Sequence, residues 1–137
     1  MQLDCKKCER WDNMIKRYIE SSIADAIKYF SIVLLTGPRQ IGKSTILYHS
    51  FATNGYSYVS LDDQLELIMA KSDLKSFLDI DPYPLIIDEA QKAPELFVEI
   101  ERIVNISRLE RDDLNSNGMY ILSGSQRKKL LGQLPIT

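Results

Sequence analysis

The nine residues GPRQIGKST, from Gly37 to Thr45, constrain the fold more than any other stretch of the chain. They directly follow residues 31–36, SIVLLT, whose apolar residues show no polar alternation and so predict a strand covered on both faces. Residues 43–52 predict a helix that ends before Asn54 and Gly55, a turn signal. An apolar strand, a glycine-containing loop and a helix in this order predict the first unit of an α/β domain.

The segments on either side of the loop continue this alternation. Before it, apolar residues at three- and four-residue spacing over residues 11–30 predict one long helix or two short helices that meet near Ser21. After it, apolar and β-branched runs predict strands over residues 56–61, 85–87 and 119–122. Helices are predicted over residues 64–78 and from Pro94 onward. Strands that alternate with helices favour one α/β domain with a mainly parallel sheet.

The composition is that of one soluble globular domain. The chain has 137 residues, of which 45% are hydrophobic and 26% are charged. A formal net charge of -2 gives no overall basic field for nucleic acid or an anionic membrane. The charged N-terminus and the lack of a long apolar run predict a cytoplasmic protein without a membrane segment. We expect residues 1–13 to form an N-terminal extension and residues 14–137 to form the domain.

Residues 37–44 match G-x-x-x-x-G-K-[ST], the phosphate loop known as Walker A. Gly37 and Gly42 permit backbone conformations that a Cβ would block, so that successive N–H groups can bind phosphate oxygens. Lys43 is expected to reach the β- and γ-phosphates, and the Ser44 hydroxyl is expected to bind Mg²⁺. Arg39 either adds positive charge near the phosphates or points to solvent. The predicted nucleotide-binding residues are Gly37, Pro38, Arg39, Gln40, Ile41, Gly42, Lys43, Ser44 and Thr45.

A strand that ends in acidic residues, LIIDE over residues 85–89, supplies the second part of the predicted site. Asp88 is expected to hold Mg²⁺ through water, as the Walker B acid does. Glu89 is the candidate general base, because its carboxylate can polarise the attacking water. An acidic pair after a strand is also common in solvated turns, but its place after a phosphate loop favours the catalytic interpretation. Glu89 further favours a hydrolase over a small-molecule kinase, which usually lacks this glutamate.

The third part of the predicted site is ILSGSQ, residues 121–126, a strand that ends in small polar residues. Ser125 is the first candidate for a residue that senses the γ-phosphate and orients the water, and Gln126 is the second. An ordinary Ser-Gly turn is the alternative. The predicted catalytic residues are therefore Lys43, Glu89 and Ser125.

Three features outside this site carry weaker signals. The basic run over residues 127–129 predicts a solvated helix face, with a nucleic-acid contact as the alternative. Cys5 and Cys8 form a C-x-x-C pair, but zinc needs four ligands and the only histidine, His49, is remote in sequence. We interpret the pair as two reduced thiols in the extension, with an intermolecular or iron–sulfur role as the alternative. Three aromatic residues are predicted to form core rather than to stack on bases: Tyr56, Tyr58 and Phe97.

Five stretches together resemble a known family: MIKRYIE, VLLTGPRQIGKSTIL, YVSLDD, LIIDEAQKAPELF and ILSGSQ, which span residues 14–126. The chain resembles the bacterial and archaeal AAA-type ATPases, in which an N-terminal P-loop domain precedes a nuclease-like C-terminal domain of unknown function. The resemblance implies an AAA-like three-layer sandwich with the strand order 5-1-4-3-2 and the site at the carboxyl ends of the strands. It also implies ATP and Mg²⁺, with Lys43, Ser44, Asp88 and Glu89 in the roles given above.

The chain departs from that family after ILSGSQ, where the family continues through a helix, a fifth strand, an arginine-bearing segment and the C-terminal domain. We therefore expect a truncated domain that lacks its fifth core strand. The first strand, residues 31–35, would then expose an apolar edge that favours self-association. Loss of an arginine that stabilises transition-state charge would lower turnover, since such a residue raises the rate about 10³- to 10⁵-fold in related NTPases.

Two hypotheses from different classes follow from these patterns. In the first, the chain binds ATP with Mg²⁺ and hydrolyses it by in-line attack of water on the γ-phosphate. In the second, it is a nucleotide-gated binding module: ATP orders a surface for DNA or for a partner chain, and this chain alone performs no useful hydrolysis. A P-loop kinase is a third alternative, which Glu89 disfavours.

Overall fold

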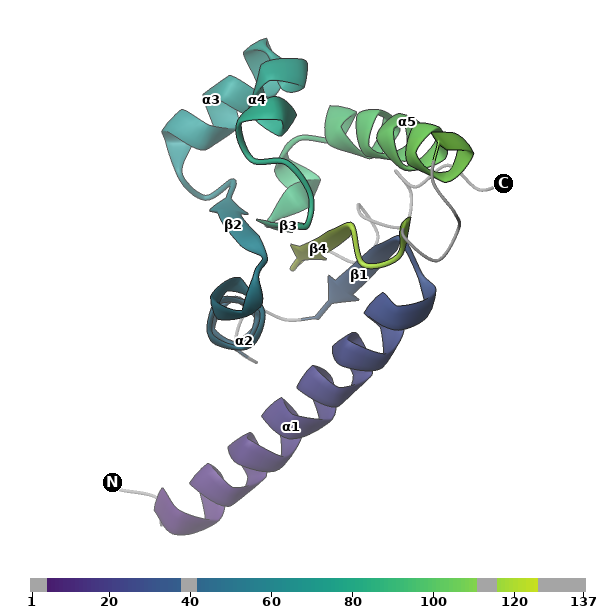
Figure 1. The fold of residues 1–137 in the computed structure, drawn as a ribbon. Helices are drawn as coiled ribbons and strands as arrows, with labels where there is room; N and C mark the ends of the chain where they lie inside the picture. Colours follow the sequence, from purple (N-terminus) through teal and green to yellow (C-terminus); the bar gives the residue numbers. More distant parts are fainter. Residues whose placement is uncertain (1–4, 38–41, 111–115, 126–137) are drawn as a thin grey trace.

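The structure is a computed structural model that describes residues 5–37, 42–110 and 116–125. Its centre is a parallel sheet with the strand order β1-β4-β3-β2 (Figure 1). The strands are β1 (Ile32–Thr36), β2 (Ser57–Ser60), β3 (Leu85–Asp88) and β4 (Tyr120–Gly124). The predicted α/β fold and the 1-4-3-2 part of the predicted strand order are confirmed.

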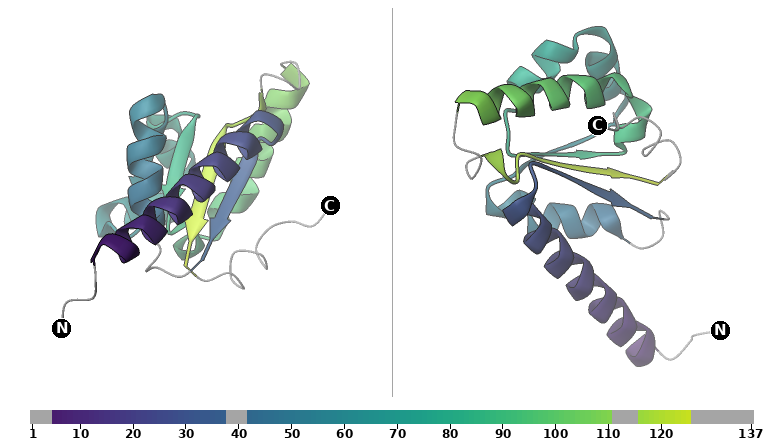
Figure 2. Two further views of the ribbon diagram at one scale, coloured as in Figure 1. Left: turned by 90° about the horizontal axis from the view of Figure 1, so that it is seen from below. Right: turned by 90° about the vertical axis from the view of Figure 1, so that its right-hand side faces the viewer.

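Helices cover both faces of this sheet. They are α1 (Cys5–Tyr29), α2 (Lys43–Ser50), α3 (Gln64–Ser72), α4 (Leu74–Ile80) and α5 (Glu95–Glu110), and the described residues also include the short 3-10 helices η2 (Ala52–Asn54) and η3 (Ala90–Lys92). α1 and α2 lie on one face, and α3, α4 and α5 lie on the other (Figure 2). The predicted three-layer sandwich is therefore confirmed.

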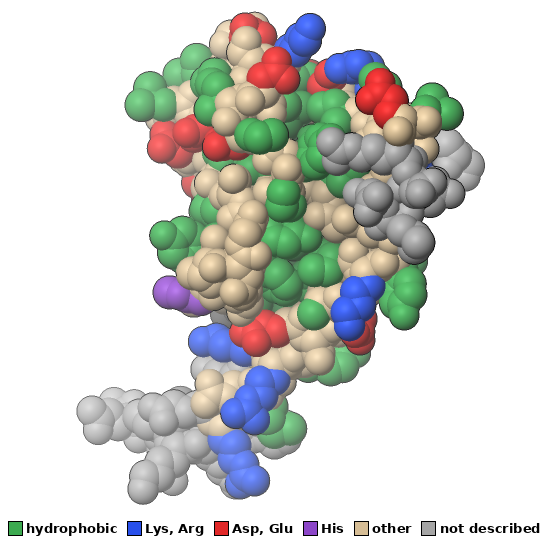
Figure 3. All heavy atoms as spheres, viewed as in Figure 1, with side chains coloured by type: hydrophobic (Ala, Val, Ile, Leu, Met, Phe, Trp, Pro, Cys, Tyr) green, Lys and Arg blue, Asp and Glu red, His purple; other side chains and the backbone are tan. Residues whose placement is uncertain are grey.

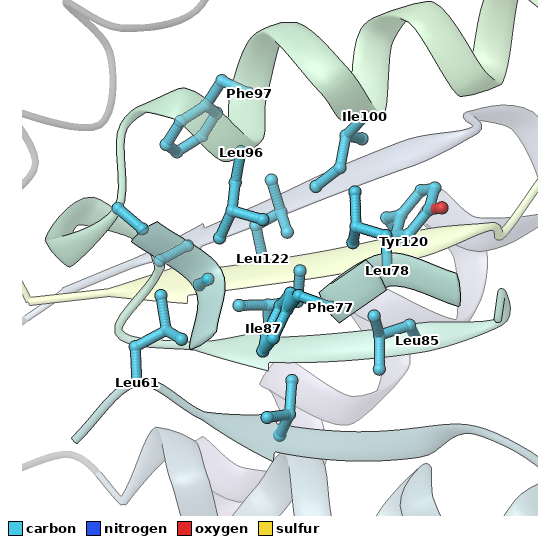
Figure 4. Packing of buried hydrophobic residues seen from close by; sticks show 14 of the residues in the cluster. Leu61, Phe77, Leu78, Leu85, Ile87, Leu96, Phe97, Ile100, Tyr120 and Leu122 are labelled. Carbon is cyan, nitrogen blue, oxygen red and sulfur yellow. The ribbon is translucent and has the colours of Figure 1, made fainter. Parts of the chain in front are cut away.

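The two faces of the sheet carry separate hydrophobic clusters, because side chains alternate along each strand. Leu85 and Ile87 of β3 pack in the cluster under α4 and α5 (Figure 4), whereas Ile86 packs in the cluster on the side of α1 and α2. Ile121 of β4 lies in the same cluster as Ile86. Every residue of β3 and β4 is buried, which explains why their apolar residues follow one another without polar alternation.

β1 lies at one edge of the described sheet, where β4 is its one described neighbour. Each residue of this strand, IVLLT, is partly exposed. The prediction of a strand covered on both faces is nevertheless confirmed, because Ile32 and Leu34 pack against one hydrophobic cluster and Val33 and Leu35 pack against the other. The partial exposure belongs to the edge of the sheet, where the described residues flank β1 on one side only. The expected apolar edge is present in these residues, and self-association through it stays a prediction.

The helix predicted over residues 64–78 is in fact two helices, α3 and α4, which meet at Asp73. Asp73 has φ -146° and ψ 81°, outside the helical region, and its side chain accepts a hydrogen bond from the Ser76 N–H at 3.2 Å. Apolar residues continue at helical spacing across this position. The local N-cap nevertheless interrupts the helix, because an aspartate side chain satisfies a backbone donor that a new helix leaves unpaired.

The N-terminal segment forms one helix, α1, so the alternative of two short helices is not observed. The predicted boundary after residue 13 lies inside this helix, and the division into extension and domain stays a prediction. The side chains of Cys5 and Cys8 lie outside what the structure describes, so their role also stays a prediction. The C-terminal half of α1 packs on the sheet through Ile23, and Glu20 accepts a hydrogen bond from the Ser50 hydroxyl at 2.7 Å.

The N-terminal half of α1 extends away from the sheet (Figures 1 and 2). Lys and Arg side chains gather on this part of the helix in Figure 3. The sequence has Arg10, Lys16 and Arg17 in this half of α1. The helix therefore carries a local basic surface although the net charge of the chain is -2. No described helix is both long and apolar enough to cross a membrane.

Gly118 precedes β4 and gives the first testable prediction. Its φ is +68°, and a Cβ at this position would lie 2.8 Å from the Tyr56 hydroxyl and 3.1 Å from the Ile27 carbonyl oxygen. Gly118→Ala should therefore lower the free energy of unfolding by about 2 kcal/mol or more, through backbone strain and overpacking together. Chemical denaturation of the purified variants measures this loss.

Gly55→Ala is the matched control for that prediction. Gly55 has φ +100°, and no described heavy atom lies within 4 Å of an added Cβ, so only backbone strain applies there. Its loss should be about 1 kcal/mol, clearly smaller than that of Gly118→Ala. Equal losses in the two variants would show that the contacts with Tyr56 and Ile27 do not matter.

Candidate functional site

Those predicted site residues that the structure describes meet at the carboxyl-terminal edge of the sheet. Gly37 follows β1, Asp88 ends β3, and Lys43 begins α2. Parallel strands place their carboxyl ends at one edge, and ligands of open α/β sheets bind there. The sheet thus brings together residues that are far apart in the sequence.

Lys43 connects two parts of this edge. Its side chain is buried, and its Nζ donates hydrogen bonds to the carbonyl oxygen of Gly37 and, at 2.6 Å, to that of Gly124. A buried ammonium group needs such acceptors, because an unpaired charge would be strongly destabilising. The ammonium group is therefore fixed between the start of the predicted loop and the end of β4.

Gly42 and the residues after it form the N-terminal end of α2. Gly42 is the N-cap and has φ 74°, a left-handed conformation that favours glycine. Ser44 and Thr45 follow in the first turn and are exposed. The N-terminus of a helix attracts anions, because its unpaired N–H groups and its dipole both favour negative charge. The remaining predicted loop residues, Pro38, Arg39, Gln40 and Ile41, lie outside the described residues.

The Asp88 carboxylate is buried and accepts four hydrogen bonds. Its Oδ2 accepts from the Ser44 hydroxyl and, at 2.6 Å, from the Tyr58 hydroxyl. Its Oδ1 accepts from the Ser123 hydroxyl and, at 3.0 Å, from the Glu89 backbone N–H. Burial raises the pKa of Asp88, but the four hydrogen bonds together hold that pKa below its ordinary value. The group is therefore a charged carboxylate at neutral pH.

Glu89 is also buried but has different partners. It is the one non-glycine residue with positive φ (55°) among those described, and it lies between β3 and η3. Its Oε2 accepts hydrogen bonds from the Gln91 side-chain amide and, at 3.3 Å, from the Ser125 hydroxyl. The Gln91 Oε1 atom is buried without a hydrogen-bond partner among the described residues. Glu89 and Ser125 thus lie side by side, and their catalytic roles stay predictions.

Three contributors to this site were not predicted: Tyr58, Ser123 and Gln91. Ser123, rather than Ser125, contacts Asp88. The alternation of side chains along strands could have predicted Ser123. Ile86 and Ile121 lie in the same hydrophobic cluster, and Asp88 and Ser123 each come two residues later on their strands, so they belong to the same face of the sheet. Gln126 and the basic residues 127–129 lie outside the described part of the chain, so their roles stay predictions.

Tyr58 shows that the core prediction for the three aromatic residues was incomplete. Phe97 is buried and Tyr56 is partly buried against a core cluster, as expected. The ring of Tyr58 packs against the same cluster as Tyr56, but its hydroxyl contacts Asp88. Burial, and then the hydrogen bond and charge of Asp88, raise the pKa of Tyr58, so its hydroxyl stays protonated and donates.

The donor atoms at this edge fit Mg²⁺. Ser44 and Asp88 offer a hydroxyl and a carboxylate, which are hard oxygen ligands, and the two groups are in direct contact. Within the described ranges no group of three or more His, Cys, Asp or Glu side chains could hold a metal ion. Mg²⁺ needs no such group, since it is usually held by one or two protein oxygens together with substrate phosphates and water.

The fold and the site together define the class of P-loop nucleotide-binding domains. The sequence model of one protein family, described as an AAA domain, matches residues 29–135, and the chain belongs to this family. No curated protein matches the chain. Membership confirms the resemblance to AAA-type domains and indicates a nucleotide-binding protein. A nuclease-like C-terminal domain and a truncated end stay predictions.

Proposed function

We propose that this domain binds ATP together with Mg²⁺ and hydrolyses it to ADP and phosphate. The observation that carries this proposal is the contact of the Ser44 hydroxyl with the Asp88 carboxylate, beside the anchored ammonium group of Lys43. These three groups have the chemistry that a metal–triphosphate complex needs: a hydroxyl and a carboxylate for the cation and a positive charge for the phosphates.

The phosphates would bind at the N-terminus of α2. There the backbone N–H groups after Gly42 and the Lys43 ammonium group offer hydrogen bonds and positive charge. Ser44 and Asp88 would hold Mg²⁺, which when bound neutralises charge that develops on the phosphate oxygens. The carbonyl oxygens of Gly37 and Gly124 already hold Lys43 at this position, so little side-chain entropy would be lost on binding.

Glu89 would act as the general base. Water attacks the γ-phosphorus, forming a new P–O bond, while the bond from that phosphorus to the bridging oxygen of ADP breaks. The water proton passes to the Glu89 carboxylate, which must lie within hydrogen-bond reach of that water. Gln91 and Ser125 support this role, because their hydrogen bonds to Oε2 restrict the orientation of the carboxylate.

A nucleotide-gated binding module is the second candidate function. Two observations favour it: β1 is a partly exposed edge strand of the described sheet, and α1 carries a local basic surface. An edge strand can pair with a strand from another chain, and a basic helix can contact the phosphates of DNA. In this case ATP binding would control the partner, and this chain alone would turn over little nucleotide.

Phosphate release from ATP by the purified chain, measured in Mg²⁺ and again in excess chelator, tests the proposed hydrolysis. We expect release that depends on Mg²⁺ and stops when the cation is chelated. Release at the background rate in both conditions, with ATP still bound, would favour the binding module over the enzyme.

A further inference from the structure

Tyr58 lies on the strand next to the predicted cation site. It belongs to β2, where it pairs with Ile86 of β3, and its hydroxyl reaches along the sheet to Asp88 Oδ2 at 2.6 Å. Its ring packs edge-to-face on Tyr48 of α2, with 5.4 Å between the ring centroids. The phenol is therefore held from two sides, by strand pairing and by a helix, and its position is well defined.

Of the four hydrogen-bond donors to the Asp88 carboxylate, cation binding would displace one and could leave the other three in place. Ser44 is the predicted cation ligand, so its hydroxyl oxygen would turn toward Mg²⁺ and release Oδ2. Tyr58 would then be the remaining protein donor on that oxygen. Ser123 and the Glu89 N–H would keep their hydrogen bonds to the other oxygen, Oδ1. Both oxygens would stay oriented while one acceptor position on Oδ2 becomes available to the cation or its water.

We propose that Tyr58 is a positioning residue for the Mg²⁺ site, whose hydroxyl holds the Asp88 carboxylate in the orientation that the cation needs. The inference rests on the proposed binding of ATP with Mg²⁺ and adds to it a residue outside the loop and the acidic pair. Hydrogen bonds to metal-binding carboxylates from such outer residues typically contribute 10- to 100-fold to metal affinity.

Tyr58→Phe tests this role, because it removes the hydroxyl and keeps the ring. Tyr56→Phe is the matched control: Tyr56 lies two residues away, and its hydroxyl donates to the Gly118 carbonyl oxygen at 2.7 Å, before the start of β4. The probe is a non-hydrolysable ATP analogue, titrated calorimetrically into each protein at saturating Mg²⁺ and in excess chelator. Thermal unfolding of each variant confirms that it is folded.

Tyr58→Phe should weaken binding of the analogue in Mg²⁺ by about tenfold and leave binding in chelator unchanged. Tyr56→Phe should match the wild type in both conditions. Three results for Tyr58→Phe would overturn the inference: unchanged binding in Mg²⁺, equal weakening in Mg²⁺ and chelator, or tighter binding in Mg²⁺, which would mean that the phenol competes with the cation. A wild type whose binding does not respond to Mg²⁺ would instead overturn the proposed function.

Discussion

Glu89→Gln should lower the rate of ATP turnover by about 10² to 10⁴ and leave ATP affinity within a fewfold of the wild type. The carboxamide has nearly the same size, and its oxygen can accept the hydrogen bonds that Gln91 and Ser125 now donate to the carboxylate. It cannot accept the proton of the attacking water. Steady-state phosphate release measures turnover, and calorimetric titration of a non-hydrolysable analogue measures affinity.

Glu110→Gln is the control for that variant, because it makes the same substitution at an exposed glutamate at the end of α5. It should keep wild-type turnover. If Glu89→Gln and Glu110→Gln hydrolyse ATP at the same rate, Glu89 is not the general base. A loss of affinity in Glu89→Gln that matches its loss of turnover would place Glu89 in nucleotide binding instead.

Lys43→Ala should weaken ATP binding by on the order of 100-fold, which corresponds to the loss of one or two hydrogen bonds made by a charged group. The ammonium group is buried and fixed by the carbonyl oxygens of Gly37 and Gly124, so the variant loses a positive charge that is held in one position. Titration of the ATP analogue in Mg²⁺ checks this expectation.

Lys71→Ala is the companion variant, since Lys71 is exposed in the last turn of α3. It should bind the analogue as the wild type does. That result would show that the loss of a positive charge elsewhere on the protein does not weaken nucleotide binding. Chemical denaturation of Lys43→Ala must accompany the titration, because Gly37 and Gly124 lose a donor in that variant. A folded Lys43→Ala protein with wild-type affinity would remove Lys43 from the phosphate site.

The main elements of the site could be predicted because they depend on local patterns and one rule of topology. The phosphate-loop motif predicts Lys43 and Ser44 as site residues, and an apolar strand followed by acidic residues predicts Asp88 and Glu89. Parallel strands then bring these groups to one edge of the sheet. The order 1-4-3-2 came from the resemblance to AAA-type ATPases and agrees with the structure.

Tyr58 and Ser123 could not be assigned in the same way, because their hydrogen bonds to Asp88 join residues 30 and 35 positions apart. Such contacts depend on which strands are neighbours and on their register. Gln91 was missed for a different reason: its partner Glu89 has a left-handed backbone, a conformation that residues other than glycine rarely adopt and that the sequence did not predict. At Asp73, a local N-cap prevailed over the helical spacing of apolar residues.

The most direct test of the account is a calorimetric titration of the wild-type chain with a non-hydrolysable ATP analogue, in Mg²⁺ and in excess chelator. We expect saturable binding of one nucleotide per chain that is tighter in Mg²⁺, because Ser44 and Asp88 would add cation contacts to the phosphate contacts of Lys43 and α2. The absence of saturable binding at millimolar nucleotide in both conditions would contradict it.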